Sequence, residues 1–101
     1  MIYMITVFYP NHKSIEVAKL YLKQPREIQY VKKWRIFNSY AGHDGVEGYH
    51  LIYTEKEKAE DAFMGIGKYF MPFNQIEGFR IQVESLIGVS DGYNLLGMKW
   101  E

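Results

Sequence analysis

The pattern of hydrophobic and polar positions divides the chain into four predicted strands and two predicted helices. β-Branched and aromatic residues are frequent at positions 2–9, 33–40, 48–53 and 79–87, which is typical of strands. Between these segments, apolar side chains recur every three or four residues, as in helices that bury one side. The predicted order is strand, helix, strand, strand, helix, strand.

The first helix is predicted from Ser14 to about Gln24. Ser14 can cap its first turn, and Pro25 discourages the helical conformation in the residue before it. We expect a buried stripe on this helix, made of Ile15, Ala18 and Leu22. Residues 26–31 either extend the helix after a kink or form a separate turn, and the pattern does not decide between these.

The second half of the chain is predicted to begin with a hairpin. The segment Gly42–Gly45 contains an Asp-Gly pair, which is typical of a tight turn between two strands. Thr54 and Glu57 then have the spacing of a capping box. The following helix carries a buried stripe made of Ala59, Ala62, Phe63, Ile66 and Phe70. Because Gly65 and Gly67 each cost a helix about 1 kcal/mol relative to Ala, we expect its second half to be irregular.

This order of elements predicts an α+β fold of the ferredoxin-like βαββαβ type. Right-handed crossovers give it a four-stranded antiparallel sheet with both helices on one face. The chain, 101 residues long, has room for one such domain, residues 1–101. Residues 88–101 form a C-terminal tail that is too apolar for a solvated end, so we expect the tail to dock.

Alternation along the strands sorts their side chains onto two faces of the predicted sheet. The set expected beneath the helices is apolar and consists of Ile5, Val7, Trp34, Ile36, Tyr49, Leu51, Ile81 and Val83. The opposite set mixes large apolar groups with a few ionisable ones: Met4, Thr6, Phe8, Arg35, Phe37, Ser39, His50, Ile52, Gln82, Glu84 and Leu86. A face this apolar is expected to be covered by a ligand or by another subunit.

The element order, the chain length and this mixed open face resemble the dimeric α/β-barrel superfamily, in which two ferredoxin-like subunits pack their open sheet faces together. The resemblance covers residues 2–87. It implies a homodimer, and it allows a small-molecule cavity in the barrel. Because residues 88–101 are apolar, we expect the C-terminal tail to dock on the partner subunit. Members of the superfamily include cofactor-independent monooxygenases, isomerases, haem enzymes and ligand-sensing domains, so the resemblance does not select a reaction.

A candidate acid–base site follows from the open face. His50 could transfer a proton, Arg35 could bind an anionic oxygen, and Glu84 would face the same cavity. The residues expected to orient a ligand there are Thr6, Phe37, Ser39 and Gln82. In the alternative interpretation, Arg35 and Glu84 neutralise each other at a subunit interface and His50 is hydrogen-bonded without chemistry. Enzyme status is therefore left open.

Composition argues against several other classes of function. The twelve basic and twelve acidic side chains cancel, which disfavours binding to nucleic acid or to an anionic membrane. The absence of Cys excludes thiolate chemistry and fits a cytoplasmic protein. His12, His43 and His50 lack the spacing of metal ligands, so neither a metal nor another cofactor is predicted. The N-terminal segment lacks the pattern of a signal peptide.

Two alternatives come from other classes of protein. Residues 2–7 and 48–53 loosely resemble the two strand motifs of RNA-recognition-motif domains, with Tyr3 and Tyr49 as base-stacking residues. Glu47 and Leu51 depart from the basic and aromatic residues of that family, which weakens this interpretation. Alternatively, the protein is an interaction or sensor module, for which the charged segment 55–61 offers a surface.

Overall fold

The computed structural model describes residues 1–40 and 44–100, so part of the predicted hairpin loop, including Gly42 and His43, lies outside the described residues. The strands are β1 (Ile2–Tyr9), β2 (Val31–Tyr40), β3 (Val46–Thr54) and β4 (Arg80–Leu86). The helices are α1 (Ser14–Lys23), α2 (Ala59–Phe70) and α3 (Val89–Leu95). Three short 3-10 helices, η1 (Asn11–Lys13), η2 (Lys56–Lys58) and η3 (Met71–Gln75), flank the first two α-helices.

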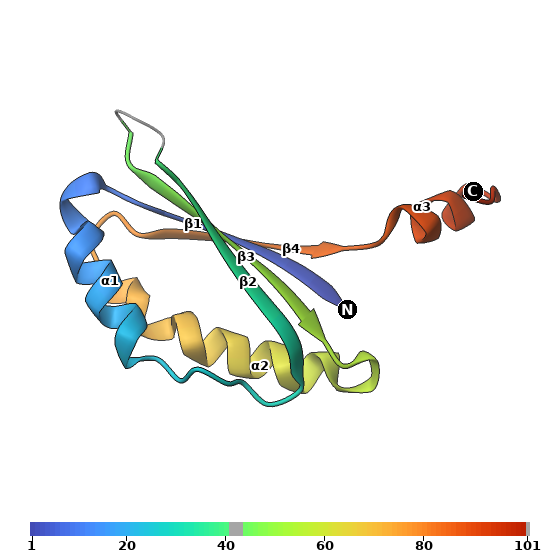
Figure 1. Ribbon diagram of the computed structural model, residues 1–101, viewed down its shortest axis with the longest axis horizontal. Coiled ribbons are helices and arrows are strands. Elements are labelled where there is room, and N and C mark those ends of the chain that lie inside the picture. Colours follow the sequence, from blue (N-terminus) through green and yellow to red (C-terminus); the bar gives the residue numbers. More distant parts are fainter. Residues whose placement is uncertain (41–43, 101) are drawn as a thin grey trace.

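The strands form one antiparallel sheet in the order β2-β3-β1-β4. Helices α1 and α2 both lie on the same face of this sheet, while the opposite face is left open (Figure 1). The α+β prediction with a four-stranded antiparallel sheet is confirmed, and the strand order is consistent with a ferredoxin-like fold.

The core lies between the sheet and the two helices. Every second residue of β1 is buried, beginning at Tyr3, because β1 is an inner strand and its alternate side chains point toward the helices. Ile52 on β3, Ile66 on α2 and Phe73 on η3 are almost fully buried against this side of β1. Aromatic rings of α2 and η3 pack against one another, with the Phe70 and Phe73 centroids 5.9 Å apart.

Both predicted helix caps are wrong. Ser14 is the first residue of α1. The N-cap position is Lys13, whose side chain makes no capping hydrogen bond. Thr54 belongs to β3, and its hydroxyl donates a hydrogen bond of 3.3 Å to the Met1 carbonyl oxygen. Each helix begins instead with a 3-10 turn, in which Lys13 donates to the Pro10 carbonyl and Lys58 to the Glu55 carbonyl. These turns lead the chain into each helix without a side-chain cap.

The predicted irregularity of the second helix is also wrong, since α2 is continuous through both of its glycines. A Cβ atom on Gly65 would lie 2.7 Å from Ile28 Cγ2, so the missing side chain lets the α1–β2 connection cross closely over α2. A Cβ atom on Gly67 would meet open space. The alternatives left open for residues 26–31 are resolved in favour of a turn, because α1 ends at Lys23 and β2 begins at Val31.

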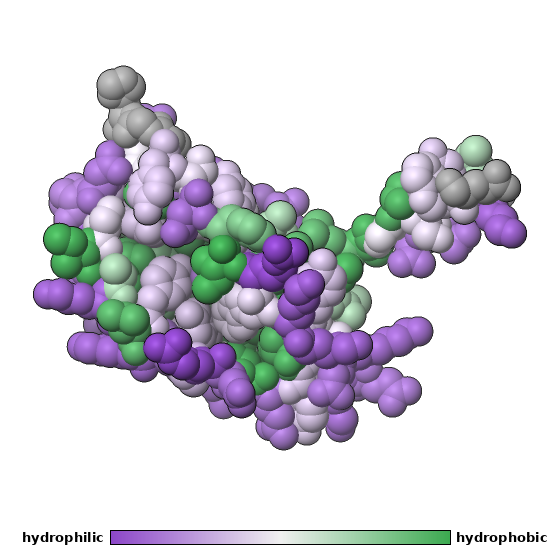
Figure 2. Space-filling view, in the orientation of Figure 1, coloured by the Kyte–Doolittle hydropathy of each residue, from purple (hydrophilic) through white to green (hydrophobic). Residues whose placement is uncertain are grey.

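Helix α3 extends away from the rest of the chain, beyond the end of β4 (Figure 1). The Cα radius of gyration, 15.6 Å, exceeds the roughly 13 Å of a compact domain of this length because of this projection. Figure 2 shows hydrophobic residues along the segment that joins β4 to α3. Large apolar side chains are exposed from this joining segment through α3 to the residues after it, namely Ile87, Val89, Leu95, Leu96, Met98 and Trp100. Docking of this segment on a partner stays a prediction.

Within the described part of the chain, no helix has the length and apolar character needed to cross a membrane.

Candidate functional site

The predicted ligand-orienting residues lie on the open face of the sheet, in rows set by the strand register. Thr6 is paired with Tyr49 and Gln82, and Tyr49 with Phe37, so these four residues form one row across the sheet. Ser39 lies in a neighbouring row, opposite Glu47. The structure therefore brings Thr6, Phe37 and Gln82 onto one surface.

Arg35 and Glu84 share the next row but occupy opposite edges of the sheet. Arg35 is opposite Leu51, Leu51 opposite Met4, and Met4 opposite Glu84. Three strand spacings of about 4.8 Å separate the two backbones by about 14 Å. Among the residues that the structure describes, the one ion pair joins Lys13 to Glu16. Arg35 and Glu84 thus do not neutralise each other within one chain.

His50 does not lie with these residues, and its predicted position on the open face is wrong. Ile5 and Ile36 are its neighbours in the register, and His50 is fully buried on the face that the helices cover. Tyr49 and Leu51, predicted beneath the helices, lie on the open face instead. The error arose because both sides of β3 mix apolar and polar residues, so alternation alone does not say which side faces the helices. The predicted group of His50, Arg35 and Glu84 therefore does not form within one chain.

The same register bears on the RNA-binding alternative. Tyr3 is buried on the covered face, where its ring lies 4.9 Å from the Phe63 ring, whereas Tyr49 lies on the open face. Tyr49 also donates a 2.6 Å hydrogen bond to Glu47 Oε2. The two proposed base-stacking residues thus lie on opposite faces of the sheet and do not form a common stacking platform.

His50 is held by two aromatic side chains. Trp34 Nε1 donates a hydrogen bond of 2.9 Å to His50 Nδ1, and the Tyr21 hydroxyl lies 3.0 Å from His50 Nε2. The Phe70 ring packs edge-on against the imidazole, with centroids 4.9 Å apart. Burial lowers the pKa of His50 to about 4, so the imidazole is neutral at physiological pH. Both of its nitrogens have partners, as expected for a buried polar group.

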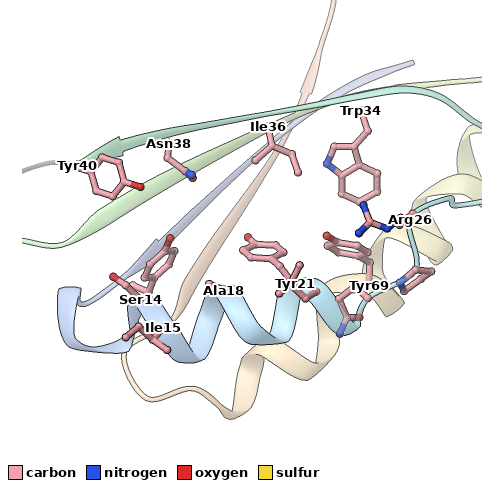
Figure 3. Close-up of a pocket in the computed structure, with 14 residues that line it drawn as sticks. Ser14, Ile15, Ala18, Tyr21, Arg26, Trp34, Ile36, Asn38, Tyr40 and Tyr69 are labelled. Carbon is pink, nitrogen blue, oxygen red and sulfur yellow. The ribbon is translucent and has the colours of Figure 1, made fainter.

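A pocket of about 610 Å³ lies next to this group, between α1 and β2 (Figure 3). Aromatic side chains form much of its wall, namely Tyr9, Tyr21, Trp34, Tyr40 and Tyr69. Its polar lining residues are Ser14, Gln24, Arg26 and Asn38. Arg26 lies at the same end as Trp34 and Tyr69, whereas Ser14 and Tyr40 lie toward the other end (Figure 3).

No protein-family model matches this chain. A comparison with curated protein sequences also finds no significant match. The pocket and the open face are therefore the grounds on which a function can be assigned.

The pocket exists because α1 covers the inner strands and leaves the edge strand β2 partly bare. Val17 is the fully buried residue of α1, whereas Ile15 is 71% and Leu22 77% exposed. On β2, Ile36 points toward the helices yet stays 52% exposed. The stripe predicted as core on α1 therefore lines a recess. Sequence reasoning missed the pocket, although apolar positions on both α1 and β2 were a signal for it.

A second, smaller pocket of about 150 Å³ lies between α2 and β4. Its lining is mostly apolar, includes Ile5, Phe63, Ile81 and Val83, and has no charged side chain among the residues that the structure describes. This volume is well below the 300–1,000 Å³ that is typical of sites for organic ligands. We therefore base the functional argument on the larger pocket.

Proposed function

We propose that this protein binds a small organic molecule in the pocket between α1 and β2. The observation that carries the proposal is the pocket itself, whose volume of about 610 Å³ lies within the range typical of small-molecule sites. Its wall is largely aromatic and apolar and contains a small number of polar groups. Sites that bind organic ligands have this composition, because apolar surface supplies affinity and a few polar groups supply orientation.

The exposed apolar side chains around the pocket support this function. Ile15 and Leu22 on α1 and Ile36 on β2 all line the pocket and are exposed. Apolar surface left in water costs roughly 25 cal/mol per Å², and a ligand seated between these side chains would recover part of that free energy. The pocket offers a bound molecule apolar contacts from two sides.

The proposal can be tested through the fluorescence of Trp34, which lines the pocket. The chain has two Trp residues, so a Trp100→Phe background isolates the signal of Trp34. Screening a library of small aromatic and aliphatic compounds in this background should find ligands that change Trp34 emission in a saturable way. Ala18→Phe places a ring in the recess from an exposed position of α1, so it should weaken each ligand at least about tenfold, a loss of 1.4 kcal/mol. Saturable binding that Ala18→Phe leaves unchanged would contradict the proposed site.

As a second function, we propose that two copies pair their open sheet faces into an α/β barrel. This face carries half-buried or exposed apolar groups in adjacent rows, including Phe37, Leu51 and Leu86. The exposed apolar segment from Ile87 to Trp100 would gain a surface to dock on in such a dimer. A second copy is the favoured occupant because two charges at the edges of this face, Arg35 and Glu84, can pair between copies.

This pairing follows from the positions of Arg35 and Glu84 at opposite ends of one row. A two-fold axis parallel to the strands exchanges the edges of the sheet, so β2 of one chain lies over β4 of the other. Arg35 then faces the partner subunit's Glu84, and the reciprocal pair forms at the other edge. Both charges gain ion-pair partners that the described residues of one chain do not provide.

Native mass spectrometry of variants in which these two charges are reversed tests this arrangement. The wild-type protein should be a dimer at micromolar concentration, and Arg35→Glu should weaken the dimer at least about tenfold because two like-charge contacts replace two ion pairs. The double variant Arg35→Glu, Glu84→Arg should recover most of the loss. Lys19→Glu, on exposed α1, is the matched control and should have no effect. A monomeric wild-type protein would contradict the paired-sheet dimer.

A further inference from the structure

The tautomer of His50 follows from its two hydrogen bonds. The indole of Trp34 can only donate, so His50 Nδ1, 2.9 Å away, must carry no proton. A neutral imidazole has one proton, which therefore lies on Nε2 and is donated to the Tyr21 oxygen at 3.0 Å. The two hydrogen bonds thus point in the same direction: Trp34 donates to His50, and His50 donates to Tyr21.

This direction leaves the hydroxyl hydrogen of Tyr21 unused. In the described part of the chain, the Tyr21 hydroxyl has His50 as its hydrogen-bond partner, and in that bond it accepts. Tyr21 lines the pocket, so its O–H can donate to a molecule bound there. Burial, with smaller contributions from Tyr69 and Tyr9, raises the pKa of Tyr21, which keeps the hydroxyl protonated. Trp34 presents its ring to the pocket, since its N–H is bonded to His50.

Arg26 gives the pocket a positive charge. It is the charged residue among the described residues of the lining, none of which is Asp or Glu. Among the described residues, no carboxylate forms an ion pair with its guanidinium. An arginine beside an aromatic wall can bind a carboxylate through two parallel hydrogen bonds while the rings hold a flat apolar body. The charge of the pocket therefore favours an anion over a cation or a neutral molecule.

We propose that the pocket takes a planar aromatic carboxylate, with its carboxylate at Arg26 and a hydrogen-bond acceptor on its ring system or carboxylate facing the Tyr21 hydroxyl. Tyr21 acts as a donor whose direction is fixed by His50 and Trp34. This inference rests on the proposed binding function and adds the chemical class of the ligand. It assigns His50 and Trp34 as positioning residues for Tyr21 rather than as groups that react.

Titration calorimetry with 2-naphthoate and its neutral counterpart 2-naphthamide tests the ligand class. The wild-type protein should bind the carboxylate about tenfold more tightly than the amide, as expected for one charge-assisted contact. Arg26→Gln should remove this preference by weakening 2-naphthoate about tenfold and 2-naphthamide less than about twofold. Lys19→Gln is the matched control, because it removes a positive charge from an exposed position of α1 that does not line the pocket, and it should change neither affinity.

Other outcomes would overturn either the proposed ligand class or the proposed binding site. Equal affinity of the wild type for both compounds, equal effects of Arg26→Gln and Lys19→Gln, or no binding of 2-naphthoate at about 1 mM would overturn the ligand class. If 2-naphthoate binds but Ala18→Phe does not weaken it, the proposed site itself is wrong. If Ala18→Phe weakens both compounds equally and neither is preferred, the site stands and the ligand class does not.

The role of Tyr21 and His50 has its own readout. Tyr21→Phe should weaken 2-naphthoate about fivefold, the loss of one hydrogen bond, while thermal unfolding confirms that the variant folds. Nitrogen NMR of the imidazole should show His50 with a protonated Nε2 and a bare Nδ1. A proton on Nδ1 would contradict the direction of the hydrogen-bond chain and with it the free hydroxyl of Tyr21.

Discussion

The two faces of this sheet come from the same alternating strands and differ in how they are covered. On the covered face, even the polar His50 is fully buried, with a hydrogen-bond partner on each ring nitrogen. On the open face, apolar groups such as Phe37 lie among charges at the edges, Arg35 and Glu84. The difference shows that burial here is decided by the position of the helices and not by the polarity of each strand residue.

A second contrast lies within the covered face. Helix α1 seals the inner strands through Val17 and Tyr21, but it leaves the helix-facing residues of β2 partly exposed. The sealed part serves as core, whereas the unsealed part forms the pocket. The proposed binding site thus lies at the margin of the core, where aromatic side chains are held rigidly and remain accessible.

The largest effect is expected from neighbouring residues on opposite faces of β3. Ile52→Ala should lower the free energy of unfolding by about 2–5 kcal/mol, because it empties a fully buried position. Leu51→Ala should cost about 1 kcal/mol or less in dilute solution, since this side chain lies on the open face. Urea unfolding at two protein concentrations measures both. The loss of unfolding free energy caused by Leu51→Ala should grow with protein concentration if the dimer covers this side chain. Equal losses for Ile52→Ala and Leu51→Ala would contradict the face assignment.

The next effect concerns acid and the buried His50. Its pKa is lowered from 6.5 to about 4, so between these pH values the unfolded chain binds a proton that the folded chain does not. Stability should therefore be intact above about pH 6.5 and fall by about 3 kcal/mol as the pH is lowered to about 4. Comparing the free energy of unfolding of the wild type with that of His50→Gln across this pH range isolates the contribution of His50. A difference curve that is flat between pH 7 and 4 would show that His50 is not buried as described.

A smaller effect distinguishes the two glycines of α2. Gly67→Ala should raise the free energy of unfolding by about 0.5–1 kcal/mol, because the helix gains propensity and the methyl group meets open space. Gly65→Ala should give no such gain, since its Cβ would crowd Ile28. Thermal unfolding compares the two variants directly. Equal stabilisation by both would indicate that the segment containing Ile28 does not press on α2.

Local patterns were sufficient to predict the order of the four strands and of helices α1 and α2, with every strand end within two residues, but they did not predict helix α3. Residues 2–9 were predicted as a strand and form β1 without a change of boundary, since β-branched residues end there at Pro10 and Asn11. The alternation of Trp34 and Ile36 also gave the correct face of β2, because its two sides differ in polarity.

The remaining features depend on contacts that a sequence pattern does not encode. The face of His50 is set by pairing with Ile5 and Ile36, and both sides of β3 by itself mix apolar and polar residues. The stripe of Ile15 and Leu22 has the spacing of core positions, yet α1 is placed so that these residues border the pocket. Arg26 follows Pro25 in a segment without regular structure, so its place in the pocket depended on the path of the chain between α1 and β2.

The central claim is that a small molecule binds between α1 and β2 and not on the open face of the sheet. A proton–nitrogen NMR titration of the labelled protein with 2-naphthoate tests this most directly, since the Trp34 indole N–H gives a resolved reporter inside the pocket. We predict that the indole signal of Trp34 and the amides of Ala18 and Tyr21 shift with one common affinity, while those of Thr6, Phe37 and Gln82 stay in place. Shifts confined to Thr6, Phe37 and Gln82 would contradict the account and place the ligand on the open face.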